Sequence, residues 1–311
     1  CSARCPRGVK QPEAMVAFRR IATKYGVFPA PVRPLRAVSA GLSAEGNPFG
    51  EERARRAGWA AGLPVKTFTE GTDLLYFPGC YPCYDPRLKK VAKATADLLT
   101  KAGVDFGILG TKESCCGESI RKTGNEELFK RLARENIKAF VENGVEKILV
   151  SSPHCYHTFK NEYPQFKVNF EVIHITQYLL GLLSEGKIKI SKEFRKRVTY
   201  HDPCYLGRHN GIFAEPREVL KKIPGLELVE MPEAKKNSLC CGMGGGGIWM
   251  ETPKEQRFSN LRLQQAVAVK AEVLVTSCPY CLTGFEDSRL ILNYDELIEI
   301  KDITEILQEV V

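Results

Sequence analysis

Residues 200–204 read YHDPC, residues 239–247 read LCCGMGGGG, and residues 276–288 read TSCPYCLTGFEDS. These three segments contain five cysteines: Cys204, Cys240, Cys241, Cys278 and Cys281. Adjacent cysteines are poor disulfide partners for each other, because a bridge between neighbours strains the backbone and the S–S torsion. Thiolates gathered from three short loops are the donors that a soft metal centre needs. The grouping therefore predicts a metal site rather than buried cysteines that act as small hydrophobic residues.

The same grouping occurs a second time, earlier in the chain and at a nearly constant distance. ESCCGES at 113–119 matches SLCCGMG at 238–244, and SSPHC at 151–155 matches SCPYC at 277–281. The paired cysteines are Cys80 with Cys204, Cys115 and Cys116 with Cys240 and Cys241, and Cys155 with Cys281, at separations of 124, 125 and 126 residues. A near-constant offset over three anchors indicates a duplicated unit.

The two copies differ at two positions that matter for metal binding. Ser152 stands in the first copy where Cys278 stands in the second, so the first copy has four of the five cysteines. Cys83, three residues after Cys80, is matched by Gly207 in the second copy. Four thiolates suffice for a cubane iron–sulfur cluster or a closed tetrahedral zinc site, and Cys83 could add a fifth ligand in a shifted geometry. We therefore expect two chemically unequal sites.

The double pattern resembles the CCG-domain iron–sulfur oxidoreductases, and within them the D-type (fused C and B) subunits of heterodisulfide reductases and their sulfite-reduction relatives. The similarity includes YHDPCYLGRHNG at 200–211, CCGMGGGGIWME at 240–251 and GNPFGEERARRAGW at 46–59, and it extends over essentially the whole chain. In that family each complete motif binds a non-cubane four-iron cluster through five cysteines. The resemblance thus implies such a cluster in the second copy, and an iron–sulfur cluster or zinc in the first.

Strand and helix patterns alternate through both copies. Buried strands are expected at 73–80, 146–155, 197–204 and 271–278, each ending at a cysteine, with helices at 86–103, 126–144, 215–225 and 253–270 between them. Such alternation predicts parallel sheets with helices on both faces, and open α/β sheets bind ligands at the carboxyl ends of their strands. We therefore predict an α/β fold of two duplicated Rossmann-like CCG units, at 71–191 and 192–311.

The first 70 residues are expected to lie outside the duplicated units. Cys1 and Cys5 form a C-x-x-x-C-P motif that resembles the last half of a ferredoxin-type C-x-x-C-x-x-x-C-P run. Residues 1–26 therefore look like the C-terminal remnant of a ferredoxin-type domain, whose cubane cluster would need at least two more cysteines upstream. Residues 27–70 are rich in proline and glycine, which predicts a linker with one helical segment around 51–61.

Composition narrows the class of protein. A hydrophobic content of 43% and a charged content of 26% are those of an ordinary globular protein, and no apolar run approaches the roughly 20 residues that span a bilayer. Twelve cysteines in so long a chain favour metal binding in a reducing compartment over disulfides. The formal charge of +8 comes from dispersed basic residues and would be reduced by bound thiolates, so no nucleic-acid partner is expected.

A few polar residues near the cysteines are further candidates. His201 could supply a proton to a departing thiolate, and Arg208 could bind a substrate carboxylate, although both could instead hydrogen-bond the Cys204 loop. His154 and His157 could face the same cleft or act as ligands other than cysteine. His174, in the apolar stretch EVIHITQYLL, is more typical of a buried core histidine.

The resemblance implies the catalytic subunit of a cytoplasmic redox complex that reduces a disulfide, either a heterodisulfide or a di- or trisulfide carried by a protein. The five cysteines of the second copy, with His201 and Arg208, would form its catalytic site, and ferredoxin-type clusters would deliver electrons. A partner such as a membrane cytochrome b-type subunit or a flavoprotein could hold it at the inner face of the membrane. The alternative is an electron-relay subunit between a flavoprotein or quinone partner and another enzyme, with no substrate of its own.

Overall fold

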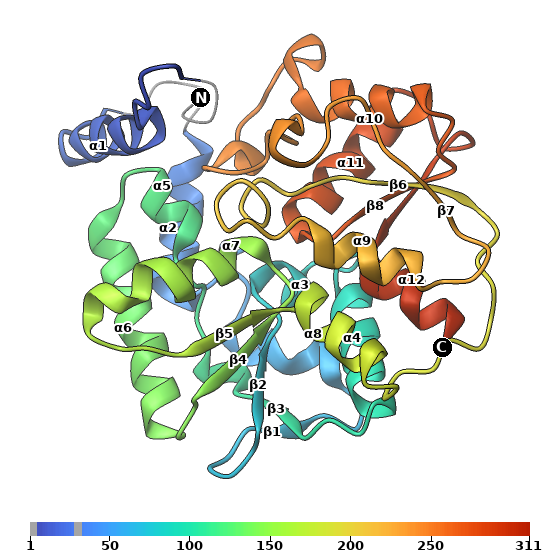
Figure 1. Cartoon of the computed structure of the whole chain (residues 1–311). Helices are drawn as coiled ribbons and strands as arrows, with labels where there is room; N and C mark the ends of the chain where they lie inside the picture. The colour runs from blue at the N-terminus through green and yellow to red at the C-terminus, as the bar shows by residue number, and fades with distance from the viewer. Residues whose placement is uncertain (1–4, 28–32) are drawn as a thin grey trace.

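Two parallel β-sheets form the centre of the protein in the computed structural model, which describes residues 5–27 and 33–311 (Figure 1). The first sheet has the strand order β1-β3-β2-β4-β5 and the second the order β7-β6-β8-β9. All strand pairs are parallel, which confirms the predicted α/β class. The strands are β1 (Lys66–Thr67), β2 (Leu74–Phe77), β3 (Phe106–Ile108), β4 (Lys147–Val150), β5 (Glu171–His174), β6 (Arg197–Tyr200), β7 (Glu227–Val229), β8 (Val273–Thr276) and β9 (Glu299–Asp302).

Helices surround both sheets. The α-helices are α1 (Gln11–Lys24), α2 (Pro34–Glu45), α3 (Cys80–Tyr84), α4 (Lys89–Lys101), α5 (Glu118–Lys122), α6 (Glu126–Glu142), α7 (Pro153–His157), α8 (Ile175–Ser184), α9 (Ala214–Lys221), α10 (Phe258–Ala268), α11 (Pro279–Ile291) and α12 (Ile303–Val310). Within the described ranges, none of these helices is long and apolar enough to cross a membrane.

The duplication predicted from the cysteines is present in the sheets. The order β3-β2-β4-β5 in the first sheet corresponds to β7-β6-β8-β9 in the second, and the first cysteine of each copy follows β2 or β6. The repeat also extends beyond the last cysteine. His174-Ile-Thr-Gln and Asp302-Ile-Thr-Glu both begin a helix, α8 and α12, with a capping box in which the first side chain accepts a hydrogen bond from the backbone.

The two units share one hydrophobic core. Helices α4 and α8 of the first unit pack against α12 and α9 of the second, respectively, and buried side chains from all four helices belong to one apolar cluster. Arg87 adds polar contacts at this interface, because its guanidinium donates to Glu305 Oε1 at 2.6 Å and to Glu286 Oε1 at 2.8 Å. Continuous apolar packing between the units holds the two sheets in a defined relative position.

The segment predicted as a linker is more regular than expected. It contains α2, whose Leu35, Val38 and Leu42 are buried, and a 3₁₀ helix at Arg53–Ala60, close to the expected helical segment. It also supplies β1, which pairs with β3 and so joins the first sheet ahead of the predicted boundary at residue 71. The prolines and glycines of this segment have structural roles that a linker prediction does not consider. Pro34 begins α2. Gly41 packs so closely on Gly50 that a Cβ on Gly41 would come within 2.9 Å of the Gly50 backbone nitrogen.

Candidate metal centres

The five cysteines of the second copy come together at the carboxyl ends of β6 and β8. Cys281 Sγ lies 3.1 Å from Cys241 Sγ, and Cys240 is the chain neighbour of Cys241. Cys204 lies near enough to Cys240, and Cys278 near enough to Cys281, for each pair to shift one another's pKa. Cys241, Cys278 and Cys281 are buried, whereas Cys204 and Cys240 are partly exposed. The five cysteines thus form a cluster of sulfur donors. Three of them are shielded from solvent, and the other two form a partly exposed side.

A shared backbone turn presents the adjacent cysteines in both units. Gly242 N–H donates to Cys240 Sγ at 3.4 Å, and Gly117 N–H donates to Cys115 Sγ at the same distance. Both glycines have a φ of +84°, a conformation that L side chains rarely adopt. A Cβ on Gly117 would also come within 2.8 Å of Phe129. The glycine of each Cys-Cys-Gly motif is therefore required by the turn that presents the sulfurs.

The electrostatics of the second set fit a cationic centre. Contact with Cys240 and burial raise the pKa of Cys241 well above its ordinary value, and burial with contact to Cys241 does the same for Cys281. Burial also acts to raise the pKa of Cys278, but hydrogen bonds from Cys281 and His154 outweigh it and lower that pKa to about 5. Crowded thiols cannot all ionise together unless a metal supplies positive charge. Five convergent sulfurs therefore suit an iron–sulfur cluster.

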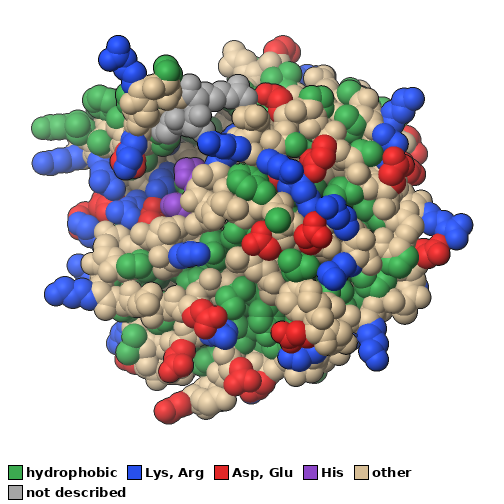
Figure 2. All heavy atoms as spheres, in the orientation of Figure 1, with side chains coloured by type: hydrophobic (Ala, Val, Ile, Leu, Met, Phe, Trp, Pro, Cys, Tyr) green, Lys and Arg blue, Asp and Glu red, His purple; other side chains and the backbone are tan. Residues whose placement is uncertain are grey.

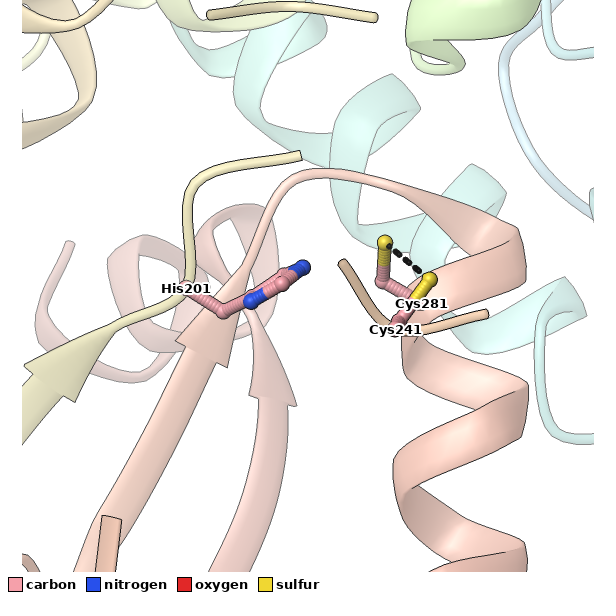
Figure 3. Close-up of side chains that lie close together, drawn as sticks. All are labelled: His201, Cys241 and Cys281. Atoms are coloured by element: carbon pink, nitrogen blue, oxygen red, sulfur yellow. Dashed lines mark hydrogen bonds between the residues drawn. The ribbon is translucent and has the colours of Figure 1, made fainter. Parts of the chain in front are cut away.

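His201 lies behind the sulfurs of Cys241 and Cys281. Its ring faces them in Figure 3, with one ring nitrogen and both sulfurs within 4.8 Å of one another. Its Nδ1 accepts a hydrogen bond from Arg262 Nε at 3.2 Å, so the ring carries its proton on Nε2. Burial and the charge of Arg262 hold the pKa of His201 well below its ordinary value. The ring is neutral and fully buried. It is therefore better suited to donate a hydrogen bond to sulfur than to act as a general acid that protonates a departing thiolate.

The loop that carries Cys204 is held by a buried ion pair. Asp202 Oδ1 and Oδ2 accept from the Nη1 and Nη2 atoms of Arg217 at 2.7 and 2.9 Å, and Asp202 also accepts from the backbone N–H of Lys235. The side chains of Asp202 and Arg217 are 2% and 5% exposed. This pair joins β6 to α9 and to the segment before Cys240, so it positions two of the cysteine loops relative to each other.

Replacing Asp202 by alanine is expected to lower the free energy of unfolding by about 3 kcal/mol, because it leaves the Arg217 charge buried with only Glu230 to pair with it. Glu218→Ala is the matched control, since it removes an exposed pair with Lys221 and should cost no more than about 0.5 kcal/mol. Urea denaturation of both variants measures the difference. Equal losses would contradict a positioning role for Asp202.

Four cysteines of the first copy line a cavity at the equivalent place. Cys80, Cys115, Cys116 and Cys155 surround it, with Ser152 at the position of Cys278 and with Tyr280 reaching in from the second unit. Cys155 Sγ lies 3.5 Å from Cys116 Sγ, and contact with Cys115 raises the pKa of Cys80. The Ser152 side chain lies near Cys155 in the lining of this cavity. The cavity therefore has a four-sulfur donor set with one hydroxyl beside it.

Arg56 is a buried cation at the first site that sequence reasoning missed. It comes from the 3₁₀ helix of the predicted linker, donates from Nη1 to Cys80 Sγ at 3.6 Å, and donates from Nε to Glu113 Oε2 at 3.2 Å. The side chains of Arg56 and Glu113 are both 1% exposed. The only sequence signal was its position in the GNPFGEERARRAGW segment. A positive charge beside Cys80 stabilises the thiolate form of that cysteine.

The other residues predicted from the sequence lie outside these two groups of cysteines. Cys83 does not line the first cavity and packs in the core near Trp59 and Tyr76. Cys5 is partly exposed just before α1, and Cys1 falls outside the described residues. Arg208 is exposed and donates to the backbone oxygen of Ser238, next to the Cys240 loop.

A hollow with basic and histidine side chains lies between the N-terminal helix and the rest of the molecule (Figure 2). His157 and His209 are 5.4 Å apart between ring centroids, and His209 stacks on Tyr205 at 4.7 Å. Arg19 of α1 donates to the backbone oxygens of Gly245 and Lys122, at 3.1 and 3.0 Å. The predicted ferredoxin-type tail is thus attached to the glycine-rich loop of the second site and to α5 of the first unit.

Duplicated α/β units with sulfur-lined sites at their strand ends define a class of cysteine-ligated metal proteins. In agreement, the cysteine-rich CCG domain model matches residues 74–160 and again 198–286. The chain therefore belongs to the CCG-domain family, as its sequence predicted.

Relatives from three organisms extend this result. The chain is 38% identical to an EtfAB:quinone oxidoreductase of Syntrophomonas wolfei, with 99% of this chain and 44% of the relative aligned. It is 39% identical to a probable iron–sulfur-binding oxidoreductase, FadF, of Bacillus subtilis, over 86% and 39% of the two chains. It is 34% identical to the D-type subunit of a heterodisulfide reductase of Methanosarcina barkeri, over 99% and 75%. The chain spans less than half the length of the first two relatives, and all three are oxidoreductases.

Proposed function

We propose that this chain is the part of an iron–sulfur oxidoreductase that reduces a disulfide-type substrate at the second cysteine site. The observation that carries the proposal is the convergence of five cysteines from three loops into one connected set, with Cys281 Sγ 3.1 Å from Cys241 Sγ. Cys204, Cys240, Cys241, Cys278 and Cys281 would hold a non-cubane four-iron cluster there. That cluster would supply electrons one at a time.

Reduction of a disulfide consumes two electrons and two protons and releases two thiols. Cys204 and Cys240 form the partly exposed side of the site, so a substrate sulfur would approach there. Arg208, exposed beside the same loop, has N–H groups free to bind a carboxylate or sulfonate of the substrate. The neutral His201 ring would orient the buried sulfurs from the opposite side, while solvent at the open side would provide the protons.

The first site would bind an iron–sulfur cluster or zinc through Cys80, Cys115, Cys116 and Cys155. Electrons would enter from a cubane cluster that includes Cys1 and Cys5. The contacts of Arg19 in α1 with Lys122 and with Gly245, in the loop after Cys241, support this route. Other redox subunits, such as a flavoprotein or a membrane cytochrome b-type protein, would complete the complex at the inner face of the membrane.

The second candidate is an electron relay to a quinone or to another enzyme, with no substrate of its own. Its support is the likeness to EtfAB:quinone oxidoreductase and the burial of Cys241, Cys278 and Cys281, each at most 3% exposed. A relay needs a cluster close to its redox partners but no bond-breaking at the cluster itself.

Anaerobic iron and sulfide analysis with EPR, followed by single-turnover mixing, separates these two functions. Protein reduced with dithionite and then freed of it is mixed either with a panel of anionic and neutral disulfides or with a soluble quinone. Disulfide reduction predicts two thiols released for every two electrons lost from the protein. Reoxidation by quinone alone, without thiol release from any disulfide, would favour the relay.

A further inference from the structure

His154 belongs to the first unit but lies against a cysteine of the second. It occupies the repeat position of Tyr280, one residue before the last cysteine of its copy. Its ring is buried between Tyr280 and Tyr205, at 4.5 and 4.6 Å between centroids, and a Cβ on Gly244, in the loop after Cys241, would lie 3.5 Å from its Cε1. Cys278 is near enough to act on the pKa of His154. The contact therefore joins the two units at a predicted cluster ligand.

Glu118 fixes the orientation of this ring. It follows the first Cys-Cys-Gly motif directly, is 1% exposed, and lies 3.0 Å from His154 Nδ1 through its Oε2. The hydroxyl of Ser119 donates to the same oxygen at 2.6 Å. Since a carboxylate only accepts, Nδ1 must donate to Glu118, which leaves Nε2 for Cys278. Carboxylate–histidine pairs of this kind orient groups around metal centres.

The exchange between the units is reciprocal. Tyr280, the counterpart of His154, lines the cavity of the first site. Its hydroxyl donates to Ser119 Oγ at 3.2 Å, because the single Ser119 proton goes to Glu118. Each unit thus places the residue before its last cysteine against the other unit's site. The chemistry differs, because the first unit supplies an imidazole that can donate to sulfur and the second supplies a phenol ring.

We propose that His154, oriented by Glu118, is a positioning residue of the second site and donates a hydrogen bond from Nε2 to the sulfur of Cys278. The inference rests on the proposed cluster at that site. A donor to a ligand sulfur withdraws negative charge and so stabilises the reduced, more negative state of a cluster. His154 therefore raises the reduction potential of the second site and makes it dependent on a residue of the first unit.

An EPR-monitored redox titration of the His154→Gln variant in the full chain tests this role. Losing a hydrogen bond to a charged sulfur should reduce the ratio of reduced to oxidised second cluster about tenfold at a given potential, a downward shift of about 59 mV. Glu118→Gln should shift it in the same direction, and the double variant should shift it no further than His154→Gln alone, because both act through one contact.

His157→Gln is the matched control, because His157 also packs on Tyr205, at 4.9 Å, and should leave the potential unchanged. If His154→Gln loses iron, Glu118→Gln, which keeps the imidazole, measures the same coupling. An intact second cluster with unchanged potential and EPR lineshape in both variants overturns this inference alone. Absence of a second cluster from the unaltered protein would overturn the proposed function as well.

Discussion

Replacing Cys241 by alanine is expected to remove the iron of the second site and to abolish disulfide reduction. Cys241 occupies the middle of the connected set, between Cys240 on one side and Cys281, 3.1 Å away, on the other. Its side chain is 3% exposed, so no water molecule or small thiol from solution can readily replace the lost sulfur. Iron and acid-labile sulfide per chain, measured anaerobically with the EPR spectrum, should fall by one cluster while the first-site signal persists.

Cys83→Ala is the matched control, because it also removes a buried thiol, 1% exposed, from the same chain. Cys83 packs in the core near Trp59 and does not line the first cavity. Its loss should destabilise the fold by about 1 kcal/mol and leave the second-site iron unchanged. Full iron content in Cys241→Ala, or equal loss in the control, would refute the assignment of the second site.

The sequence could predict that these thiols come together, because their proximity follows from the topology of a parallel sheet. In a parallel sheet the carboxyl ends of neighbouring strands meet at one edge, so cysteines placed after β6 and β8 must lie close together once those strands pair. The constant offset then placed a second set in the first unit. Strand and helix patterns were strong enough to predict both sheets, since the central strands β2, β4, β6 and β8 are buried and helices such as α4 and α6 are amphipathic.

Contacts between the units could not be predicted in the same way. The pairing of His154 with Cys278 and of Tyr280 with the first site depends on how one sheet sits against the other, which follows from packing of α4 on α12 and α8 on α9. Arg56 was missed for a related reason. It reaches Cys80 from the 3₁₀ helix at Arg53–Ala60. That helix was expected, but its position over the core depends on the irregular chain on either side, which has no periodic signal.

Ser152 is the clearest chemical difference between the two sites, and its replacement by alanine should cost far less than Cys278→Ala. Both residues stand at the N-cap of a helix in extended conformation, α7 for Ser152 and α11 for Cys278, so the backbones present their side chains alike. The donors are not alike: serine is a hard, weakly acidic oxygen donor, whereas soft iron–sulfide centres prefer thiolate. Ser152 instead lies near Cys155, where its hydroxyl can act on a ligand sulfur from outside the donor set.

We therefore expect Ser152→Ala to reduce disulfide reduction by no more than about tenfold, the lower end of what an outer hydrogen bond to a metal ligand contributes. Cys278→Ala should lower the rate of disulfide reduction more than about a hundredfold, because it removes a proposed ligand. Steady-state rates with one disulfide, normalised to iron content, compare the two variants. Equal damage from Ser152→Ala would mean that the hydroxyl binds metal or supplies a proton.

Ser152→Cys completes the series, because it restores the fifth sulfur of the repeat beside Cys155. The new thiol would stand at the edge of a cavity that already contains four sulfurs and the positive charge of Arg56 near Cys80. It should change the EPR spectrum of the first site, and the second-site signal should stay as it is. A changed second-site signal would show that the two sites are linked by more than the His154 contact. An unchanged first-site spectrum would mean that zinc, which has no EPR signal, or no metal at all occupies that site.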